Sequence, residues 1–356
     1  MEKFISFKRI KKPNLDPNKF LRLFRQEFGH KFNKKKISKN DLNKFYYPDS
    51  RKIIWEISKF HKVPYSFINI GLGAESLIKD LYLWHSKKFS KKKIVGFGVP
   101  NYFMYTIYAK IFNYKILNYT IEPSKILKQT TADVIKFISK NKIKLLIITN
   151  PSNPFEKNWS RAEITKIVDY CKKKKIIMLI DEVYQGSGSK SVDYLTKKYS
   201  NLIIVRSFSK VFGLPGIRVG YIIASSKICK EIETYRLSTE LPQTSIDEAL
   251  KALEKRQKIL KKNSKKIILA RNYAHKELYS RGFKTYNYYN NSVTIDLKNK
   301  FYAQKVGNYL KKRKIYINYC FPKKLSKYIN FTTTHISNIK IFLKNFDLII
   351  KKIKFN

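Results

Sequence analysis

A lysine that could form an imine lies five residues after an apolar run, among small hydroxyl residues. The run is Leu202–Val205 and the lysine is Lys210, with Ser207 and Ser209 before it and Arg218 after it. An amine must be deprotonated to form an imine, and desolvation near other cations favours this state. The hydroxyls and the guanidinium suit a phosphate dianion. By itself, Lys210 would more simply be one solvated lysine among 63, so the hypothesis needs partners elsewhere.

An acid follows a second apolar run. Ile176–Ile180 leads directly into Asp181, and Tyr184 comes three residues later. A carboxylate at the end of a buried strand costs free energy unless it meets a cation. A pyridinium N–H is such a cation, and pyridoxal 5'-phosphate (PLP) needs that proton for its ring to accept electrons. Tyr184 could then reach the phenolic oxygen of the ring. For Asp181 alone, a helix N-cap after the strand is the simpler interpretation.

Two other segments hold groups suited to the same ligand. Asn153 lies between two prolines after the apolar run Leu145–Thr149, where its amide could point at a ligand. Tyr102 follows the apolar run Ile94–Phe97 and could stack on a flat ring. The alternatives are an ordinary turn for Asn153 and a place in the core for Tyr102.

A glycine-rich segment at Gly71–Ser76 precedes a helical pattern. Small residues before a helix start can form a backbone N–H site for an anion, here at Gly73, Ala74 and Glu75. Glycine-rich turns are common, so this segment predicts a phosphate site only together with the others.

The elements that must position these residues alternate along the chain. Predicted strands are Ile94–Phe97, Lys115–Tyr119, Leu145–Thr149, Ile176–Ile180, Leu202–Val205 and Gly220–Ala224. Predicted helices between them include Ala74–Phe89, Thr131–Ser139 and Arg161–Lys174. This alternation predicts an α/β fold with a mostly parallel sheet, whose ligand lies at the carboxyl ends of the strands. The candidate residues above fall at those ends.

The pattern changes after about residue 235. One long helix is predicted at Ser245–Leu278, then short strands at Ser292–Leu297 and Ile315–Asn318, and a final helix at Ile336–Ile353. We therefore predict an N-terminal arm at residues 1–40, a large PLP-binding domain at 41–235 and a smaller α+β domain at 236–356. The arm could also be part of the smaller domain.

Taken together, the motifs resemble a known family. The series GLGAES, PNYFMY, NPSNP, DEVY, SFSK and GLPGIRVGY is similar to fold-type-I PLP enzymes of the aminotransferase class I/II group. The closest resemblance is to histidinol-phosphate aminotransferases and threonine-phosphate decarboxylases. It covers roughly residues 40–300 well and the remainder weakly.

The resemblance implies a role for each candidate. Lys210 would hold PLP as a Schiff base and move protons, Asp181 would pair with the pyridine nitrogen, and Tyr102 would stack on the ring. Tyr184 and Asn153 would bind the phenolic oxygen. The phosphate would be held by Ser207, Ser209, Arg218 and the backbone at Gly73, Ala74 and Glu75. Tyr47 matches a family tyrosine that reaches the neighbouring subunit's cofactor, so the resemblance also implies a homodimer with shared active sites.

The sequence departs from the family where arginines are expected near the C-terminus. Asn330 stands where the family has an arginine for the substrate carboxylate, and Asn318 where it has one for a distal phosphate. An amide cannot supply a charge or a five-donor fork. The substrate then lacks that carboxylate, or another cation replaces the arginine, or the alignment has slipped. The candidate replacements are Lys323, Lys324, Lys327 and Arg236. Asn318 and Asn330 remain candidate substrate residues.

A net charge of +50 raises the question of nucleic-acid binding. Of 75 basic residues only 12 are arginine, and the lysines are spread along the whole chain. Abundant Ile, Asn, Tyr and Phe accompany them, so AT-rich codon usage explains the composition as a set. We therefore expect no specific nucleic-acid partner, only weak affinity for polyanions at low salt.

The remaining features favour a cytoplasmic enzyme. The sequence has no apolar run of 18 residues and no recognisable signal peptide, so we expect neither a membrane span nor secretion. Cys171, Cys229 and Cys320 lie far apart, which predicts no disulfide framework and no metal site.

Three functions compete. The first is a PLP-dependent aminotransferase for a small amine or an amino acid, phosphorylated or not, working through the Lys210 Schiff base and pyridoxamine phosphate. The second is a PLP-dependent decarboxylase or lyase on a phosphorylated amino acid. The third is a basic binding protein on a degraded enzyme scaffold. The intact set of Lys210, Asp181, Tyr184, Asn153 and Arg218 favours the enzymes.

Overall fold

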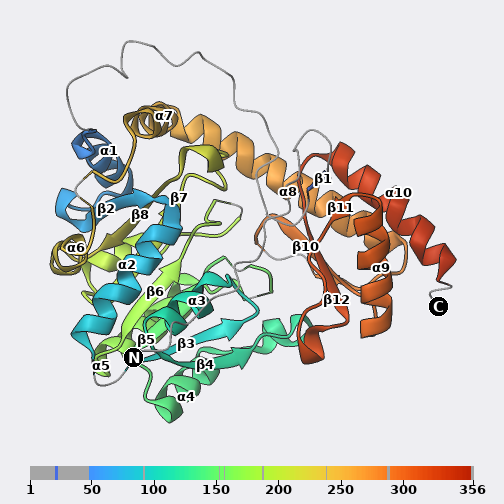
Figure 1. Cartoon of the computed structure of the whole chain (residues 1–356), viewed down its shortest axis with the longest axis horizontal. Helices are drawn as coiled ribbons and strands as arrows, with labels where there is room; N and C mark the ends of the chain where they lie inside the picture. Colours follow the sequence, from blue (N-terminus) through green and yellow to red (C-terminus); the bar gives the residue numbers. More distant parts are fainter. Residues whose placement is uncertain are drawn as a thin grey trace, which may run out of the picture.

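The computed structural model describes residues 21–22, 48–90, 93–151, 153–155, 157–186, 188–237, 239–286 and 289–353. A seven-stranded sheet between helices fills one side of the molecule, and a C-terminal region with its own small sheet fills the other (Figure 1). The predicted α/β class is confirmed.

The large sheet has the strand order β2-β8-β7-β6-β5-β3-β4. Its strands are β2 (Ile68–Leu72), β3 (Ile94–Val99), β4 (Lys115–Thr120), β5 (Leu145–Thr149), β6 (Ile177–Asp181), β7 (Leu202–Ser207) and β8 (Val219–Ala224). Strands β3 to β7 pair in parallel, and β8 runs antiparallel to β7 and β2. The six predicted strands are present, with ends shifted by two residues at most. β2 was not predicted, because Asn69 and Gly71 interrupt its apolar pattern.

Helices cover both faces of this sheet (Figure 1). Helices α2 (Gly73–Lys88), α3 (Met104–Ile111) and α6 (Ser226–Glu233) share one hydrophobic cluster. Helices α1 (Arg51–His61), α4 (Thr131–Asn141), α5 (Arg161–Lys173) and α7 (Gln243–Glu254) share the other. Strand β5 divides its side chains between the two clusters: Leu145 and Ile147 belong to the first, Leu146 and Ile148 to the second. A sheet buried on both faces produces such continuous apolar runs.

The strand order places the candidate residues at one edge of the sheet. The chain passes from β3 to the edge strand β4 and then returns to β5 on the other side of β3. Helices α3 and α5 consequently lie on opposite faces, and the carboxyl ends of β3 and β5 flank the crevice in which such sheets bind ligands. Tyr102 follows β3, Asn153 follows β5, Asp181 ends β6 and Lys210 follows β7.

The C-terminal region has a three-stranded sheet in the order β12-β10-β9. Its strands are β9 (Thr285–Tyr286), β10 (Ser292–Asp296) and β12 (Tyr328–Thr332), and its helices are α8 (Arg256–Ser280), α9 (Lys300–Lys312) and α10 (Ile336–Lys352). They enclose a separate cluster in which the Phe331 and Phe342 rings stack at 4.1 Å. The short strand β1 (Leu21–Arg22) pairs in parallel with β11 (Ile315–Tyr316), so this part of the predicted arm joins the C-terminal region.

Two predicted boundaries in this region are wrong. The single helix predicted at Ser245–Leu278 is interrupted at Lys255, where α7 ends and α8 begins. Arg256 donates a side-chain hydrogen bond to the carbonyl of Leu253 at 3.0 Å, which satisfies an acceptor at the break. The strand predicted at Ile315–Asn318 ends at Tyr316, and Asn318 forms only an isolated bridge to Asn330.

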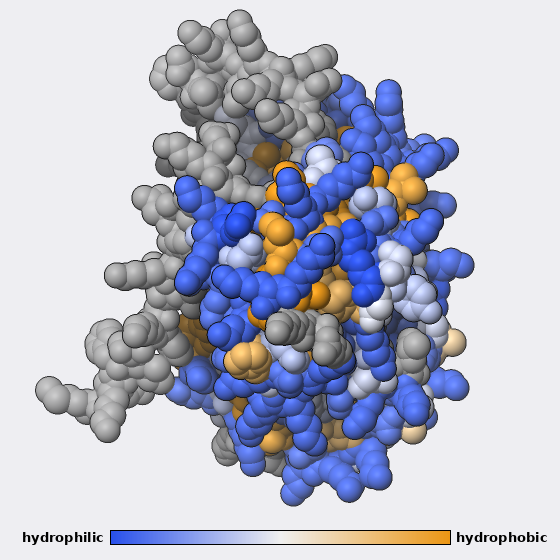
Figure 2. Space-filling model, turned by 90° about the vertical axis from the view of Figure 1, so that its right-hand side faces the viewer, coloured by the Kyte–Doolittle hydropathy of each residue, from blue (hydrophilic) through white to orange (hydrophobic). Residues whose placement is uncertain are grey.

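On the face shown in Figure 2, hydrophilic side chains cover most of the coloured surface, and apolar side chains gather between them near its middle. Within the described ranges, no helix is long and apolar enough to cross a membrane.

Candidate active site

Asp181, the last residue of β6, is a buried carboxylate with two donors. The backbone N–H of Val183 donates to Oδ1 at 2.9 Å, and the hydroxyl of Tyr105 donates to Oδ2. Burial raises the pKa of Asp181 to about 6, although both hydrogen bonds and the charge of Lys210 act against the rise. Turn residues follow β6, so Asp181 does not cap a helix there. The N-cap interpretation is wrong.

Tyr184, Asn153 and Lys210 meet beside Asp181. The amide Nδ2 of Asn153 donates to the Tyr184 hydroxyl oxygen at 2.8 Å. The Lys210 Nζ lies 5.5 Å from the centre of the Tyr184 ring. Burial raises the pKa of Tyr184 far above its usual range, and the charge of Asp181 adds to this effect. Three loops, after β5, β6 and β7, thus bring an amide, a phenol, a carboxylate and an amine to one place.

The start of α2 forms a narrow cradle with β8. A Cβ added to Gly220 would lie 2.4 Å from the backbone nitrogen of Ala74, so only glycine allows β8 to approach the helix start this closely. A Cβ added to Gly73 would lie 2.8 Å from Arg218 Nη2, which places the guanidinium directly over this turn. Gly73 has a φ of +72°, a conformation that favours glycine. Backbone N–H groups and one guanidinium therefore converge where an anion can bind.

Ser207 and Ser209 complete this side of the site. The backbone N–H of Ser209 donates to Ser207 Oγ at 3.0 Å, and Ser207 Oγ donates to Ser209 Oγ at 2.9 Å. Ser207 also pairs with Gly220 across β7 and β8. Ser207 at the end of β7 and Ser209 two residues after it therefore lie next to the cradle, and their role as phosphate ligands stays a prediction.

The side chain of Glu75 also takes part in the site, in addition to its backbone N–H at the start of α2. Its carboxylate accepts hydrogen bonds from the hydroxyls of Tyr102 at 2.9 Å and Tyr108 at 3.4 Å. Tyr102 is therefore fixed at its hydroxyl end, while its ring packs edge-on against Tyr105 with the centres 5.7 Å apart. A tyrosine held in this way presents a fixed ring face, which suits the predicted stacking role.

A buried ion-pair network lies behind the site. Arg206 donates to Glu182 from Nε at 3.0 Å and from Nη2 at 2.6 Å, and it lies 3.8 Å from Asp193. His61 bonds to both Asp193 and the Tyr221 hydroxyl. Glu182 follows Asp181 and Arg206 precedes Ser207, so the network ties together the strand ends that carry the site.

Helix α8 supports the loops that carry Tyr184 and Lys210. Asn263 donates to the carbonyl of Val211 at 2.8 Å, and the neighbouring Ser264 donates to the carbonyl of Gly186. A Cβ added to Gly186 would lie 3.2 Å from Val211, so the two loops pack directly on each other. The loops are therefore held from α8 as well as from the sheet.

These groups fit PLP atom by atom. The amine can bind its aldehyde carbon, the buried acid its ring nitrogen, and the Asn153–Tyr184 pair its phenolic oxygen. The glycine cradle with Arg218 and the two serines suits its phosphate. The described residues contain no group of His, Cys, Asp and Glu that could hold a metal ion.

A family model described as "Aminotransferase class I and II" matches residues 33–343. The chain belongs to this family. Histidinol-phosphate aminotransferase from Thermoanaerobacter pseudethanolicus is 29% identical over 273 residues, which are 75% of this chain and 74% of the relative. The chain is a PLP-dependent aminotransferase, so the predicted cofactor and enzyme class are confirmed.

Two solved structures share the aminotransferase fold. Histidinol-phosphate aminotransferase from Sinorhizobium meliloti, in complex with pyridoxal-5'-phosphate, has a TM-score of 0.83 at 16% identity and covers 98% of this chain and 99% of that one. L-threonine-O-3-phosphate decarboxylase from Porphyromonas gingivalis has a TM-score of 0.71 at 16% identity, with coverage of 93% and 99%. At these identities the similarity shows the fold alone.

Of the two asparagines at the family's arginine positions, Asn330 lies in β12 of the C-terminal sheet and Asn318 forms an isolated bridge to it. Asn318 and Asn330 exchange backbone hydrogen bonds of 2.8 Å. Asn330 is 1% exposed, and its Nδ2 donates to Ser292 Oγ at 3.1 Å and to Thr294 Oγ1 at 2.9 Å. Its Oδ1 accepts from Asn318 Nδ2 at 3.4 Å. Both amide protons of Asn330 are thus engaged within the sheet, so binding a substrate carboxylate would require these bonds to break.

Two of the four predicted replacement cations are already engaged. Arg236 pairs with Asp80 at 3.2 Å and with Glu240, and Lys327 donates to Asp296 at 2.8 Å. Lys323 and Lys324 are exposed and line a groove of about 770 Å³, whose lining also includes Lys125 and Lys128. They are the candidates that remain for an anionic end of a substrate.

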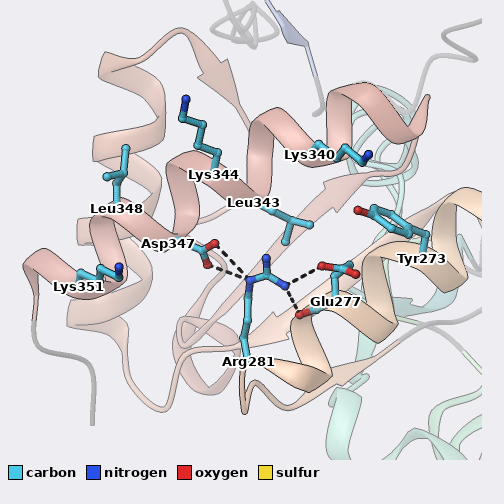
Figure 3. A pocket seen from close by; sticks show the side chains of 9 residues that line it. All are labelled: Tyr273, Glu277, Arg281, Lys340, Leu343, Lys344, Asp347, Leu348 and Lys351. Carbon is cyan, nitrogen blue, oxygen red and sulfur yellow. Dashed lines mark hydrogen bonds and ion pairs between the residues drawn. The ribbon is translucent and has the colours of Figure 1, made fainter.

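A separate hollow of about 420 Å³ lies between α8 and α10, on the outside of the C-terminal region (Figure 3). At its centre Arg281 donates to Asp347 at 3.0 Å and to Glu277 at 2.9 Å, so its charge is already neutralised. None of its nine lining residues belongs to the PLP site described above.

The sequence interpretation missed residues that only support others. Tyr105, Glu182 and Arg206 were not singled out, although each stands next to or three residues from one that was. The three-residue spacing of Tyr102, Tyr105 and Tyr108 was the available signal for Tyr105. Tyr47, predicted to reach a neighbouring cofactor, lies outside the described residues.

Proposed function

We propose that Lys210 carries PLP and moves the proton between the substrate α-carbon and the cofactor. When bound, PLP supplies an electron sink for the bond that breaks at that carbon. The ionised Asp181 carboxylate pairs with the ring nitrogen and keeps its proton in place. Tyr184 and Asn153 bind the phenolic oxygen, and Tyr102 covers one face of the ring and excludes water from it. The contacts of Asn153 and Lys210 with Tyr184, and the bond that fixes Tyr102 to Glu75, support these roles.

The phosphate is held by Ser207, Ser209, Arg218 and the N–H groups at the start of α2. The glycine cradle supports this assignment, because β8 and α2 approach too closely for any side chain at Gly220. Anions bind well at a helix start, where unpaired N–H groups and the helix dipole act together.

We infer that the substrate is a small phosphorylated amine with no carboxylate on the carbon that bears the amino group. The observation that supports this inference is Asn330, which is uncharged, buried and bonded to Ser292 and Thr294. Relatives named histidinol-phosphate aminotransferase act, by their name, on such a compound: histidinol phosphate has no carboxylate. The same observation disfavours decarboxylation, which requires a substrate carboxylate.

The experiment uses the purified PLP enzyme and single additions of amine. Histidinol phosphate should convert bound PLP to pyridoxamine phosphate, as followed by absorbance, at least tenfold faster than glutamate does. Loss of one charge-assisted contact is worth about 1.5–3 kcal/mol, or roughly 10- to 150-fold. Carbon dioxide release from phosphothreonine without this conversion would support the decarboxylase instead.

Equal rates with glutamate would contradict the substrate inference. In that case Lys323→Gln and Lys324→Gln variants identify a replacement cation, since one of them should slow the reaction with glutamate alone. The exposed position of both lysines makes damage to the fold by these substitutions small.

We also propose a cytoplasmic homodimer with shared sites, built from a large domain at 41–235 and a small domain at 236–356, with the arm at 1–40. Exposed Leu72, Tyr235 and Leu237 support an interface where the two domains join, because Arg236 lies against Gly71 and brings the two segments together. Light scattering of the purified protein tests the dimer. A mixture of inactive Tyr47→Ala and Lys210→Arg chains should regain activity if Tyr47 reaches the neighbouring cofactor, and no gain would contradict shared sites.

A further inference from the structure

The carboxylate of Asp181 is held from helix α3 as well as from its own turn. The Val183 N–H binds Oδ1, and this contact is local to the chain segment. The Tyr105 hydroxyl binds Oδ2 and comes from a different element, 76 residues earlier in the chain. A carboxylate bound at both oxygens by separate elements has a fixed rotamer, which a single local contact does not ensure.

Tyr105 is itself held in place on all sides. Its backbone carbonyl accepts a hydrogen bond from the Tyr82 hydroxyl at 3.0 Å, and its side chain is fully buried. The centre of its ring lies 6.0 Å from that of Phe97 and 5.7 Å from that of Tyr102. The Tyr105 and Tyr102 rings are nearly perpendicular, at 89°. The Tyr105 hydroxyl is therefore directed at Asp181 by contacts with β3, α2 and the Tyr102 ring.

Several charged or titratable groups influence Asp181. Lys210 favours the ionised carboxylate, whereas the adjacent Glu182 and burial favour the protonated form. The charge of Asp181 in turn contributes to the raised pKa values of Tyr102 and Tyr184. The pKa of Asp181 is raised to about 6, close enough to neutrality that losing one donor to the carboxylate matters.

We propose that Tyr105 is a positioning residue for the cofactor: it keeps Asp181 ionised and aimed at the ring nitrogen of PLP. This inference rests on the proposed role of Asp181. Tyr105 itself touches neither the ring nor the substrate in this scheme and acts only through the carboxylate. The expected consequence is a selective effect on the part of PLP binding that depends on the ring nitrogen.

The test is Tyr105→Phe, which retains the ring contacts and removes only the hydroxyl. PLP affinity, measured by fluorescence titration of the cofactor-free enzyme, should fall about tenfold at pH 7.5. As the pH is lowered, the affinity for PLP should begin to fall at a higher pH in the variant than in the unmodified enzyme. Binding weakens once Asp181 is protonated, and without the Tyr105 donor this protonation occurs at a higher pH. The phosphate of PLP titrates in both proteins, so the difference between them isolates Asp181.

Tyr114→Phe is the matched control. Tyr114 is also buried in the same cluster, but its hydroxyl donates to the Tyr82 carbonyl at 3.2 Å and lies 2.8 Å from His85 Nδ1, so none of its hydrogen bonds in the described part of the chain reaches Tyr105 or Asp181. It should lose comparable thermal stability while keeping the PLP affinity and its pH midpoint. If both variants show the same affinity and midpoint, Tyr105 has no positioning role.

A PLP analogue with carbon in place of the ring nitrogen separates positioning from general damage. Tyr105→Phe should bind this analogue as tightly as the unmodified enzyme does, because the analogue has no ring nitrogen for Asp181 to pair with. Equal losses for PLP and the analogue would overturn the inference. Asp181→Asn tests the underlying assignment separately: normal PLP binding in that variant would refute the role of Asp181, whereas weakened binding there with normal binding in Tyr105→Phe refutes only the role of Tyr105.

Discussion

The carboxyl edge of the large sheet and the paired strands β10 and β12 of the C-terminal sheet both contain buried polar side chains, but the two groups are arranged differently. Around Asp181, donors come from several loops and helices and converge on one place between them. Around Asn330, the amide donates only to the neighbouring strand, at Ser292 and Thr294. The groups around Asp181 are placed to act on a ligand between them, whereas the bonds of Asn330 link two strands of one sheet. Equal burial of polar groups does not imply equal function.

The largest effect that this contrast predicts is at Lys210. Lys210→Arg keeps the positive charge but cannot form the covalent link to PLP, so activity should fall by about 10³-fold or more. Borohydride treatment followed by peptide mapping should label Lys210 in the unmodified enzyme and no residue in the variant. Asn330→Ala, the matched change in the other region, should leave the labelling intact. Labelling of another lysine would contradict the assignment.

The next effect is on stability. Arg206→Leu leaves Glu182 buried without its cation, which typically costs about 3–5 kcal/mol of unfolding free energy. The control is Arg281→Leu in the C-terminal region, where the ion pairs in the hollow of Figure 3 are partly exposed and worth about 1 kcal/mol or less. Urea unfolding of both variants checks the difference. Similar losses would mean that the Arg206 network does not support the site more than a surface pair does.

His61 makes the stability of the sheet region depend on pH. Burial and the charge of Arg206 lower its pKa to about 4, despite its bond to Asp193. Below pH 6.5 the unfolded chain takes up a proton that the folded chain does not, so stability is lost as the pH falls from 6.5 to 4. A shift of this size corresponds to about 3 kcal/mol.

The measurement compares the unmodified protein with His61→Gln, whose amide can still bond Asp193 and Tyr221. Asp181 acts with the opposite sign between about pH 4 and 6, because its pKa is raised in the folded state. Because Asp181 is present in both proteins, its contribution cancels when the two pH profiles of unfolding free energy are subtracted. The variant should lose less unfolding free energy between pH 6.5 and 4, and identical pH profiles would show that His61 is not responsible.

The smallest expected effect is at Asn330. Asn330→Ala removes the amide and leaves the hydroxyls of Ser292 and Thr294 without it, which should cost about 1–3 kcal/mol of stability. PLP affinity should stay within about twofold, because the described contacts of Asn330 lie in the C-terminal sheet. A large loss of PLP binding or of histidinol phosphate turnover would show that Asn330 belongs to the active site after all, and the contrast between the regions would fail.

Sequence patterns predicted the large sheet better than the C-terminal region. A strand buried on both faces is a continuous apolar run, so Leu145–Thr149 was predicted with its observed ends. β12 was not predicted, because Asn330 and Thr332 interrupt its apolar residues and their partners lie across the sheet. The interruption at Lys255 was also missed, since the helical pattern continues on both sides of it.

The sequence by itself determined the family, the cofactor and the candidate residues around Lys210, because their types and order along alternating strands and helices are specific together. Only the tertiary structure decided which side chains support them. Tyr105 donates a hydrogen bond to Asp181, 76 residues later in the chain, and Arg206 donates to Glu182 from the neighbouring strand. The amide of Asn330 donates to Ser292 and Thr294. Such pairings depend on which strands and helices lie side by side, and the residues next to each position in the sequence do not indicate that arrangement.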